Sequence, residues 1–413
     1  MTQPDYRQRL VDPLLVDLLR ELPALSLQGP RASGKTTTAI RHARTVVRLD
    51  QPREAGVFRA DPDAALRDLA EPVLLDEWQE VPEVLGAVKR AVDADPRGGR
   101  FILTGSVRAE LDVATWPGTG RVIDIEMTTL TVRERLGDPS VRPFLDRIAD
   151  DELDFPSRID GVDLRDYVDL ALVGGFPEPA LRVSGQARRR WFNGYVRQLT
   201  TRDAEHVAPG RDPQRLARFL AVQAHSTAGV VTERTLHEAA GIDARTAGEY
   251  ERLLRNLFVL DVVPAWHSNR LKRLASRPKR YLTDTALAAA LMRVDRTGLM
   301  RDSDLLGRMI DTFVAAQLRA EVSVAEAEPT IYHLRERDNR EVDLLIEYGM
   351  GRVIGIEVKA TAAPSRDDGR HLAWLRDELG DRFIRGLVLH TGPGFFQLGE
   401  RVHALPIAAI WAS

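Results

Sequence analysis

The stretch Gly29-Pro-Arg-Ala-Ser-Gly-Lys-Thr36 is the strongest fold signal in the sequence. It follows the short apolar segment Ala24-Leu-Ser-Leu-Gln28, which is typical of a buried strand, and Thr37 begins a helical pattern. A strand, a glycine-containing loop and a helix in this order are typical of a phosphate-binding loop. The two glycines let backbone N–H groups face phosphate oxygens, and the dipole of the following helix adds positive potential. This context predicts a P-loop NTPase fold with a parallel α/β sheet.

The side chains of this loop have distinct expected roles. Lys35 can reach the β- and γ-phosphates of ATP, and the Thr36 hydroxyl can bind Mg²⁺. The sequence therefore predicts ATP and Mg²⁺ as cofactors. The predicted nucleotide-binding residues are Gly29, Pro30, Arg31, Ala32, Ser33, Gly34, Lys35, Thr36 and Thr37.

A second apolar strand ends in two carboxylates, at Val73-Leu-Leu-Asp-Glu77. At the carboxyl edge of a parallel sheet, Asp76 would hold Mg²⁺ through water and Glu77 would polarise the attacking water. An Asp-Glu pair after an apolar run is common at solvated strand ends, but the phosphate loop before it favours the catalytic interpretation. Lys35 and Glu77 are therefore the predicted catalytic residues of this region.

A third strand, Phe101-Ile-Leu-Thr-Gly-Ser106, ends in hydroxyl side chains that we expect near the same edge. Thr104 or Ser106 could sense the γ-phosphate or orient the water, although a polar strand cap explains either residue equally well. Phosphoryl transfer also needs positive charge beside the developing transition state. The candidate arginines for that role are Arg121, Arg197 and Arg202.

Length and composition restrict the class of protein. The 413 residues predict two to four domains, and contents of 44% hydrophobic and 29% charged residues fit a soluble globular protein. No apolar run reaches the roughly 20 residues of a membrane span, and the first residues lack the apolar region of a secretory signal. The absence of cysteine excludes disulfides, thiolate metal sites and cysteine nucleophiles. We therefore expect a cytoplasmic protein without a membrane partner.

In order and spacing, these and further motifs resemble a family of bacterial and archaeal AAA+-like ATPases that carries a conserved carboxyl-terminal region of unknown function. The resemblance implies that Lys35, Thr36, Asp76 and Glu77 have the ATPase roles described above. The pair Gly120-Arg121 is a further match, but in such proteins a longer run of small residues often precedes the pair, and its absence here weakens a specific role for Arg121. The matching motifs include Leu49-Asp-Gln-Pro52, Leu103-Thr-Gly-Ser106, Gly174-Gly-Phe-Pro-Glu178, Arg202-Asp203, Tyr281-Leu-Thr-Asp284, Glu341-Val-Asp343 and Ile356-Glu-Val-Lys359.

Four regions are expected after an ATPase core of residues 1–136. Residues 137–162 are acidic and proline-punctuated, which predicts a linker or insertion. Residues 163–210 have a helical pattern and would form a lid over the nucleotide. Residues 211–283 predict a winged helix-turn-helix, and residues 284–413 predict a second α/β domain.

Residues 211–283 combine helical patterns with a basic stretch. The predicted elements are helices at Arg215–His225, Thr232–Ala240 and Ala244–Phe258, and an extended segment at Val259–Val263. The net charge of −3 gives no overall attraction to nucleic acid, but residues 269–280, which include Lys279 and Arg280, are basic and contain no acid. This stretch could bind DNA phosphates; the alternative is a packing module with a solvated basic loop. The candidate DNA contacts are Arg245, Arg252, Arg270, Lys272, Arg273 and Arg277.

The last region contains two carboxylates and a lysine on neighbouring strands. Asp343 begins one apolar strand, Glu357 and Lys359 share a face of the next, and a glycine-containing hairpin joins the two strands. The pattern resembles the PD-(D/E)XK nuclease core, in which the two carboxylates bind Mg²⁺ and the lysine helps to activate a water. The resemblance adds Asp311 as a further carboxylate, and Arg370 and His371 as phosphate contacts. Relatives of this core that have lost cleavage leave a structural or DNA-tethering role open.

Three functions are consistent with these motifs. The first is an ATP-driven enzyme that acts on DNA and cuts or holds it. The second is a nucleotide-switched module that binds DNA or protein and cuts nothing. The third is an ATPase that acts on protein partners. A homo-oligomer follows if the catalytic arginine comes from a neighbouring subunit, whereas an arginine from the same chain permits a monomer.

Overall fold

The computed structural model describes residues 6–108, 120–208, 210–267, 276–336 and 340–412. The chain divides into two compact units. The first contains Met1–Thr129 with Arg255–Phe258, and the second contains Leu130–Leu254 with Val259–Ser413.

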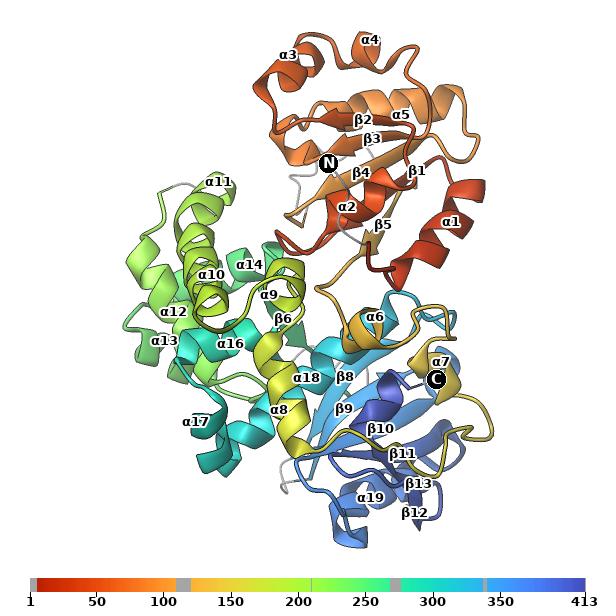
Figure 1. Ribbon diagram of the computed structural model, residues 1–413, viewed down its shortest axis with the longest axis vertical. Coiled ribbons are helices and arrows are strands. Elements are labelled where there is room, and N and C mark those ends of the chain that lie inside the picture. Colours follow the sequence, from red (N-terminus) through yellow and green to blue (C-terminus); the bar gives the residue numbers. More distant parts are fainter. Residues whose placement is uncertain (1–5, 109–119, 209, 268–275, 337–339, 413) are drawn as a thin grey trace. The chain divides into compact units, whose positions relative to one another are not determined.

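A five-stranded parallel sheet forms the centre of the first unit (Figure 1). Its strand order is β2-β3-β4-β1-β5, so β4 lies between β1 and β3. The inner strands β1, β3 and β4 are buried along their whole length, as expected for a parallel sheet that is covered on both faces. The bounds are β1 Ala24–Gln28, β2 Thr45–Arg48, β3 Val73–Asp76, β4 Phe101–Gly105 and β5 Val122–Glu126.

Helices provide the apolar layers of this unit. One face of the sheet packs against Phe58, Trp78 and Val88, from α3, η1 and α5. Strand side chains alternate, so Leu25, Leu74 and Ile102 supply the buried residues of the other face. The bounds are α1 Val11–Glu21, α2 Lys35–Ile40, α3 Pro52–Ala60, α4 Pro62–Leu66, η1 Trp78–Glu80 and α5 Val84–Ala94.

The second unit begins with short helices that pack into its core. Residues 137–162, predicted as a linker or insertion, contain α7 and fully buried Phe144 and Leu145. The backbone N–H of Phe144 donates to Glu321 Oε2 at 2.7 Å, and the Tyr348 hydroxyl donates to the Leu145 carbonyl at 2.7 Å. The few apolar residues of this stretch therefore anchor it in the second unit. The bounds are α6 Val132–Leu136 and α7 Phe144–Arg147.

Helices occupy most of residues 163–256. The expected helicity of residues 163–210 is present, while their role as a lid stays a prediction. The three helices α12, α13 and α14 lie near their predicted bounds, and Gly241 adopts φ 65° between the last two. The bounds are α8 Leu164–Val173, α9 Pro177–Leu181, α10 Gly185–Gln198, the π-helical η2 Leu199–Asp203, α11 Ala204–Val207, α12 Pro213–His225, α13 Glu233–Ala240 and α14 Ala244–Asn256.

An antiparallel pair, β6 Leu260–Val263 and β7 Lys279–Leu282, follows α14. This is the element order that a winged helix-turn-helix would have, and that assignment stays a prediction. After β7, the buried Asp284 connects two of the sequence motifs. One of its carboxylate oxygens accepts the N–H of Leu287 at the start of α16 Thr285–Met292, and the other accepts the N–H of Gly175 at 2.7 Å. A Cβ at Gly174 would lie 2.6 Å from this carboxylate, so only glycine fits there.

A six-stranded mixed sheet dominates the rest of the second unit (Figure 1). Its order is β12-β13-β11-β10-β9-β8; β10, β11 and β13 are parallel, and β8, β9 and β12 pair antiparallel to their neighbours. Helix α19 packs closely on β10 and β11, because a Cβ at Gly355 or Gly386 would meet Leu372 within 2.8 Å. The bounds are α17 Arg296–Arg301, α18 Ser303–Val322, β8 Thr330–Arg335, β9 Glu341–Glu347, η3 Gly349–Gly351, β10 Val353–Lys359, η4 Arg366–Gly369, α19 Arg370–Leu379, η5 Gly380–Arg382, β11 Phe383–His390, β12 Phe396–Gly399, β13 Val402–Pro406 and η6 Ile407–Ile410.

Candidate nucleotide site and carboxylate cluster

The phosphate loop connects β1 to α2, as the sequence predicts. Ala32 and Gly34 have left-handed φ angles of 62° and 98°, which turn the backbone into the start of the helix. Gly29 is required by a close approach, since a Cβ there would lie 2.0 Å from the carbonyl oxygen of Met127. The loop therefore has the tight backbone that phosphate binding by N–H groups needs.

Lys35 begins α2 and is buried. Its ammonium donates to the carbonyl oxygens of Gly29 at 3.0 Å and Pro30 at 2.9 Å, both in the loop itself. Burial lowers the pKa of Lys35 from 10.5 to about 8, and the carboxylates of Glu77 and Asp76 oppose that shift. The hydrogen-bond acceptors of this ammonium are thus neutral carbonyl oxygens.

Asp76 lies at the end of β3 and joins the loop to the neighbouring strand. Its Oδ1 accepts the Thr36 hydroxyl at 2.7 Å and the Thr104 hydroxyl at 2.6 Å. Burial raises the pKa of Asp76, and these two hydrogen bonds oppose the rise. A hydroxyl and a carboxylate oxygen together are donors that Mg²⁺ accepts, with phosphates and waters filling its other positions. The predicted magnesium ligands are therefore adjacent.

Glu77 follows β3 and has a left-handed φ of 55°. Its backbone N–H donates to the Thr104 hydroxyl at 3.2 Å, and its Oε2 accepts the Ser106 hydroxyl at 3.0 Å. The Gln79 side-chain amide donates to the same carboxylate oxygen. Thr104 and Ser106, predicted as sensor residues, thus contact the carboxylates directly. Gln79 was not predicted, because a lone glutamine after a strand carries no distinctive pattern.

Arg9 is a further residue of the site that sequence reasoning missed. It is buried, donates to the Ser33 carbonyl of the phosphate loop at 2.9 Å, and donates to the Thr128 carbonyl at 2.8 Å. The guanidinium therefore connects the loop to the chain that follows β5. An arginine ahead of an amphipathic helix is usually solvated, so the sequence gives no signal for this role.

The candidate arginines lie elsewhere. Arg121 directly precedes β5, and the parallel register of β5 with β1 puts it at the amino-terminal edge of the sheet, opposite the phosphate loop. It forms an ion pair with Asp93 at 2.9 Å. The structure thus does not bring Arg121 to the nucleotide site of its own chain. Arg197 and Arg202 are exposed residues of the second unit.

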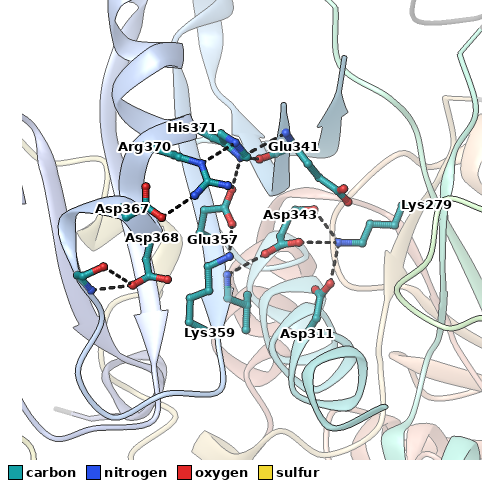
Figure 2. A network of polar contacts seen from close by, with 12 residues as sticks. Lys279, Asp311, Glu341, Asp343, Glu357, Lys359, Asp367, Asp368, Arg370 and His371 are labelled. Carbon is teal, nitrogen blue, oxygen red and sulfur yellow. Dashed lines mark hydrogen bonds and ion pairs between the residues drawn. The ribbon is translucent and has the colours of Figure 1, made fainter. Parts of the chain in front are cut away.

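The structure brings together several residues of the second predicted site, that of the nuclease-like region (Figure 2). Lys359 and Glu357 form an ion pair at 2.9 Å on β10, and both point towards the Asp343 side of the network. The pairing of β9 with β10 ends at Leu344 and Ile356, and beyond it the N–H of Val358 donates to Asp343 Oδ2 at 2.9 Å. The opening between the two strands therefore accommodates the Asp343 carboxylate.

Lys279 corrects the sequence interpretation of the basic stretch. Lys279 and Arg280 end the basic stretch that is expected to contact phosphates or to form a solvated loop, but both side chains are buried. Arg280 pairs with Glu251 at 2.8 Å, and Lys279 extends from β7 to Asp311 at 2.6 Å and Asp343 at 3.2 Å (Figure 2). A lysine inside an Arg- and Lys-rich run looks solvated, because the sequence does not reveal the carboxylates that it meets.

The pKa values of the three carboxyl groups of this cluster are shifted in different directions. Burial raises the pKa of Asp311 to about 7, against the opposing effect of Lys279. Burial raises that of Glu357 to about 8, and the Asp343 charge adds to the rise. Burial also acts on Asp343, but Lys279 and the Val358 N–H outweigh it and lower its pKa. Asp343 is therefore the carboxyl group that is most firmly ionised.

His371 and Arg370 lie beside the cluster at the start of α19. His371 Nδ1 lies 2.8 Å from the Glu341 carbonyl oxygen and 3.9 Å from Glu357 Oε1. Arg370 forms an ion pair with Asp367 at 2.6 Å and donates to His371 Nε2 at 3.3 Å. His371 thus lies close to the Glu357 carboxylate, and Arg370 lies beside His371 and pairs with Asp367.

Of the DNA-contact candidates, three can be located. Arg252 and Arg277 are exposed, and Arg245 is exposed but ion-paired with Glu249 at 3.2 Å. Arg270, Lys272 and Arg273 lie outside the described residues. Among the residues that are described, no three His, Asp or Glu side chains are arranged to hold a metal ion. No helix in the described ranges is long and apolar enough to cross a membrane.

Comparisons with known proteins add information on each region. Residues 21–136 match the model of an AAA domain, residues 164–298 match a domain of unknown function (DUF8612), and residues 306–410 match another (DUF4143). Two uncharacterized proteins, Mb2031c of Mycobacterium bovis and Rv2008c of Mycobacterium tuberculosis, are each 27% identical over 393 residues, which is 94% of this chain and 81% of theirs.

Among solved structures, the chain is similar to the Walker-type ATPase PABY2304 of Pyrococcus abyssi. The identity is 16% and the TM-score 0.43, over 71% of this chain and 99% of the other.

The AAA-domain match agrees with the parallel sheet, the phosphate loop and the carboxylates at the end of β3. Together they support a P-loop ATPase fold for the first unit, with ATP binding and hydrolysis as its activity.

Proposed function

We propose that this protein is an ATPase that hydrolyses ATP with residues of the first unit and uses the second unit to engage DNA. The observation that carries the ATPase half is the hydrogen-bonded chain from Thr36 through Asp76 to Thr104, with Glu77 directly beside it. It supplies a hard-cation ligand set and a carboxylate for water activation at one edge of the sheet.

Each side chain has a definite task in this proposal. Lys35 would exchange its two loop carbonyls for oxygens of the β- and γ-phosphates, which are stronger acceptors because they are charged. Glu77 would accept a hydrogen bond from the attacking water and orient it, while Ser106 holds the Glu77 carboxylate in place. Bound Mg²⁺ would supply positive charge that stabilises the negative charge developing on the transferred phosphoryl group.

The test is steady-state ATP turnover, with and without duplex DNA, for wild type, Lys35→Ala and Glu77→Gln. We expect Lys35→Ala to lose ATP binding and Glu77→Gln to bind ATP without turning it over. Stimulation of wild-type turnover by DNA supports the DNA half of the proposal. Turnover that survives both substitutions would contradict the ATPase half.

An arginine supplied by a second copy of the chain is part of this proposal. The reason is the position of Arg121 at the amino-terminal edge of its own sheet. From that edge it would not contact phosphates bound at the phosphate loop of the same chain. A specific ATPase rate that rises with protein concentration, and falls with Arg121→Ala, supports an assembly in which one copy completes the site of another. A rate that is independent of concentration points to a monomer.

DNA binding through α14 and the chain near β7 is supported by the exposed Arg252 and Arg277. Ion pairing with Glu249 reduces what Arg245 would contribute. Fluorescence anisotropy with labelled duplex measures the effect of Arg252→Ala with Arg277→Ala. Arg189→Ala with Arg190→Ala on α10 is an exposed control with the same charge loss. Affinity that falls only in the first variant, with a shallower salt dependence, supports phosphate contacts by these residues.

Metal-dependent DNA cleavage is the second candidate function. It is favoured by the element order α18-β8-β9-β10-α19-β11 together with the proximity of Asp343, Glu357 and Lys359. Incubation with Mg²⁺ or Mn²⁺ and varied DNA substrates, for wild type and Lys359→Ala, tests it. Absence of cleavage in wild type leaves the nucleotide-switched DNA-binding module as the function.

A further inference from the structure

The ammonium group of Lys279 is surrounded by oxygen atoms. It lies 2.6 Å from Asp311 Oδ2, 3.2 Å from Asp343 Oδ1 and 3.3 Å from the carbonyl oxygen of Asp343 (Figure 2). An ammonium has three N–H donors and no acceptor, so these three oxygens satisfy its whole hydrogen-bonding capacity. The side chain is fully buried, which means that water contributes little to stabilising its charge.

The two aspartates are satisfied by the same arrangement. The second oxygen of Asp311 accepts the Tyr281 hydroxyl at 3.0 Å, and the second oxygen of Asp343 accepts the Val358 N–H at 2.9 Å. All four carboxylate oxygens therefore have a partner from the chain itself. Tyr281 and Lys279 both come from β7, so one strand supplies a donor to each oxygen of Asp311 and to one oxygen of Asp343.

Lys359 has a different position in the cluster. It pairs with Glu357 at the exposed side, and one-third of its side-chain surface remains accessible. Glu357 Oε1 is buried and accepts no hydrogen bond within the described chain. The cluster thus combines three carboxyl groups with two ammonium groups, and only the ammonium of Lys279 lies between two of the carboxylates.

We propose that Lys279 is the resident cation of this cluster and occupies the position in which Asp311 and Asp343 would otherwise bind a divalent metal ion. The folded wild-type site then takes no Mg²⁺ or Mn²⁺. Loss of the Lys279 ammonium converts the same oxygens into a divalent-cation site, because two buried carboxylates without a counter-charge attract a hard cation strongly. This inference builds on the proposed nuclease-like site, but it concerns metal binding and not cleavage.

The experiment is a Mn²⁺ titration of nucleotide-free protein, in which electron paramagnetic resonance measures the free ion. All variants carry Asp76→Asn, so that the nucleotide site does not contribute. We expect Lys279→Met to bind one Mn²⁺ at least tenfold more tightly than the parent. Lys359→Met is the matched control, because it removes a lysine charge from the rim and leaves the position between the aspartates filled; it should bind as the parent does.

One result overturns the proposal whether or not the Lys279 variant folds. If the parent binds one Mn²⁺ ion and Asp343→Asn abolishes that binding, the position is already open to metal. A folded Lys279→Met, verified by circular dichroism, that binds no Mn²⁺ overturns it as well, and Lys279→Gln offers a polar replacement if the methionine does not fold. The inference expects no metal-dependent DNA cleavage by the wild type, so absence of cleavage removes the nuclease function and leaves the inference standing. Mg²⁺- or Mn²⁺-dependent cleavage that Asp343→Asn abolishes would support the nuclease function and overturn the inference, so the two failures are distinguishable.

Discussion

Lys35 and Lys279 are both buried lysines, yet their environments differ in kind. Lys35 donates to two neutral carbonyl oxygens of its own loop, and burial lowers its pKa to about 8. Lys279 lies between two carboxylates, and although burial acts on it too, Asp311, Tyr281 and Asp343 raise its pKa well above the usual value. The charge of Lys35 is only partly compensated, by the nearby Glu77 and Asp76, whereas that of Lys279 is compensated by two carboxylates in direct contact.

The difference indicates which of the two sites is prepared for a ligand. A buried ammonium among neutral acceptors is improved by an anion, so the phosphate loop gains from a nucleotide. A buried ammonium among carboxylates gains nothing from an added cation or anion. A bound nucleotide would therefore balance the charge of Lys35 at the phosphate loop. The chain's own carboxylates balance the charge of Lys279 in the carboxylate cluster.

The largest expected effect lies at the nucleotide site. Glu77→Gln should reduce ATP turnover by about 100-fold or more, because a carboxylate that orients and polarises the water typically contributes that much. ATP affinity should change little, since the phosphate loop is untouched. Steady-state turnover and equilibrium binding of a fluorescent ATP analogue measure the two effects. Glu83→Gln, an exposed glutamate beside α5, is the control and should retain wild-type turnover.

The second prediction compares the two lysines directly by the same substitution. Lys279→Met should lower the free energy of unfolding by about 3–5 kcal/mol, because it leaves two buried carboxylates without their cation. Lys35→Met should change it by less than about 1 kcal/mol, since it removes a charge whose burial is unfavourable. Urea denaturation of the nucleotide-free protein measures both. Equal losses from the two substitutions would show that the contrast between the sites is wrong.

The third prediction concerns pH. ATP binds the protonated form of Lys35, whose pKa in the folded protein is about 8, so affinity should be constant below pH 8 and fall by roughly tenfold per unit above it. The stability cost of this lysine has the opposite trend: it is fully present below pH 8 and disappears as pH rises to the usual 10.5. Calorimetric titration with ATP between pH 7 and 9.5 tests the binding. Lys35→Arg should bind with a flat profile over that range.

The smallest expected effect concerns Arg9. Arg9→Lys removes the two-pronged contact between Ser33 of the loop and Thr128, so KM for ATP should rise several-fold while kcat changes less. Initial rates over a range of ATP concentrations separate the two constants. Arg7→Lys, an exposed neighbour, should leave both unchanged. A fall in kcat with constant KM would contradict a role in positioning the loop.

Much of the fold and of the candidate site of the first unit could be predicted from local sequence patterns. The loop from Gly29 to Thr36 and the strand ending in Asp76 and Glu77 each combine a short apolar run with a polar end, and the parallel order then forces those ends to one edge. The contacts of Thr104 and Ser106 with the two carboxylates follow from the same geometry. The role of Arg9 could not be predicted in this way, because its partners are the backbone carbonyls of Ser33 and Thr128, which are distant in sequence.

The carboxylate cluster shows why the rest could not be predicted. Asp343, Glu357 and Lys359 lie on a hairpin, and their proximity follows from strand alternation. Lys279 comes from another strand pair, and only the tertiary fold brings it to Asp311. The anchoring of residues 137–162 could not be predicted for a similar reason. Phe144 and Leu145 are buried where they contact Glu321 of α18 and Tyr348 after β9, which the acidic composition of that stretch does not indicate.

Lys279 of β7 contacts the carboxylate cluster although it lies outside the domain that the sequence comparison delimits. The DUF4143 match begins at residue 306, after Lys279, yet it contains Asp311, Asp343 and Glu357. A fragment cut at that boundary keeps the whole sheet but loses half of its balancing positive charge. We therefore expect such a fragment to be less stable than one that also contains the β6–β7 pair, because Asp311 and Asp343 would be buried without the Lys279 cation.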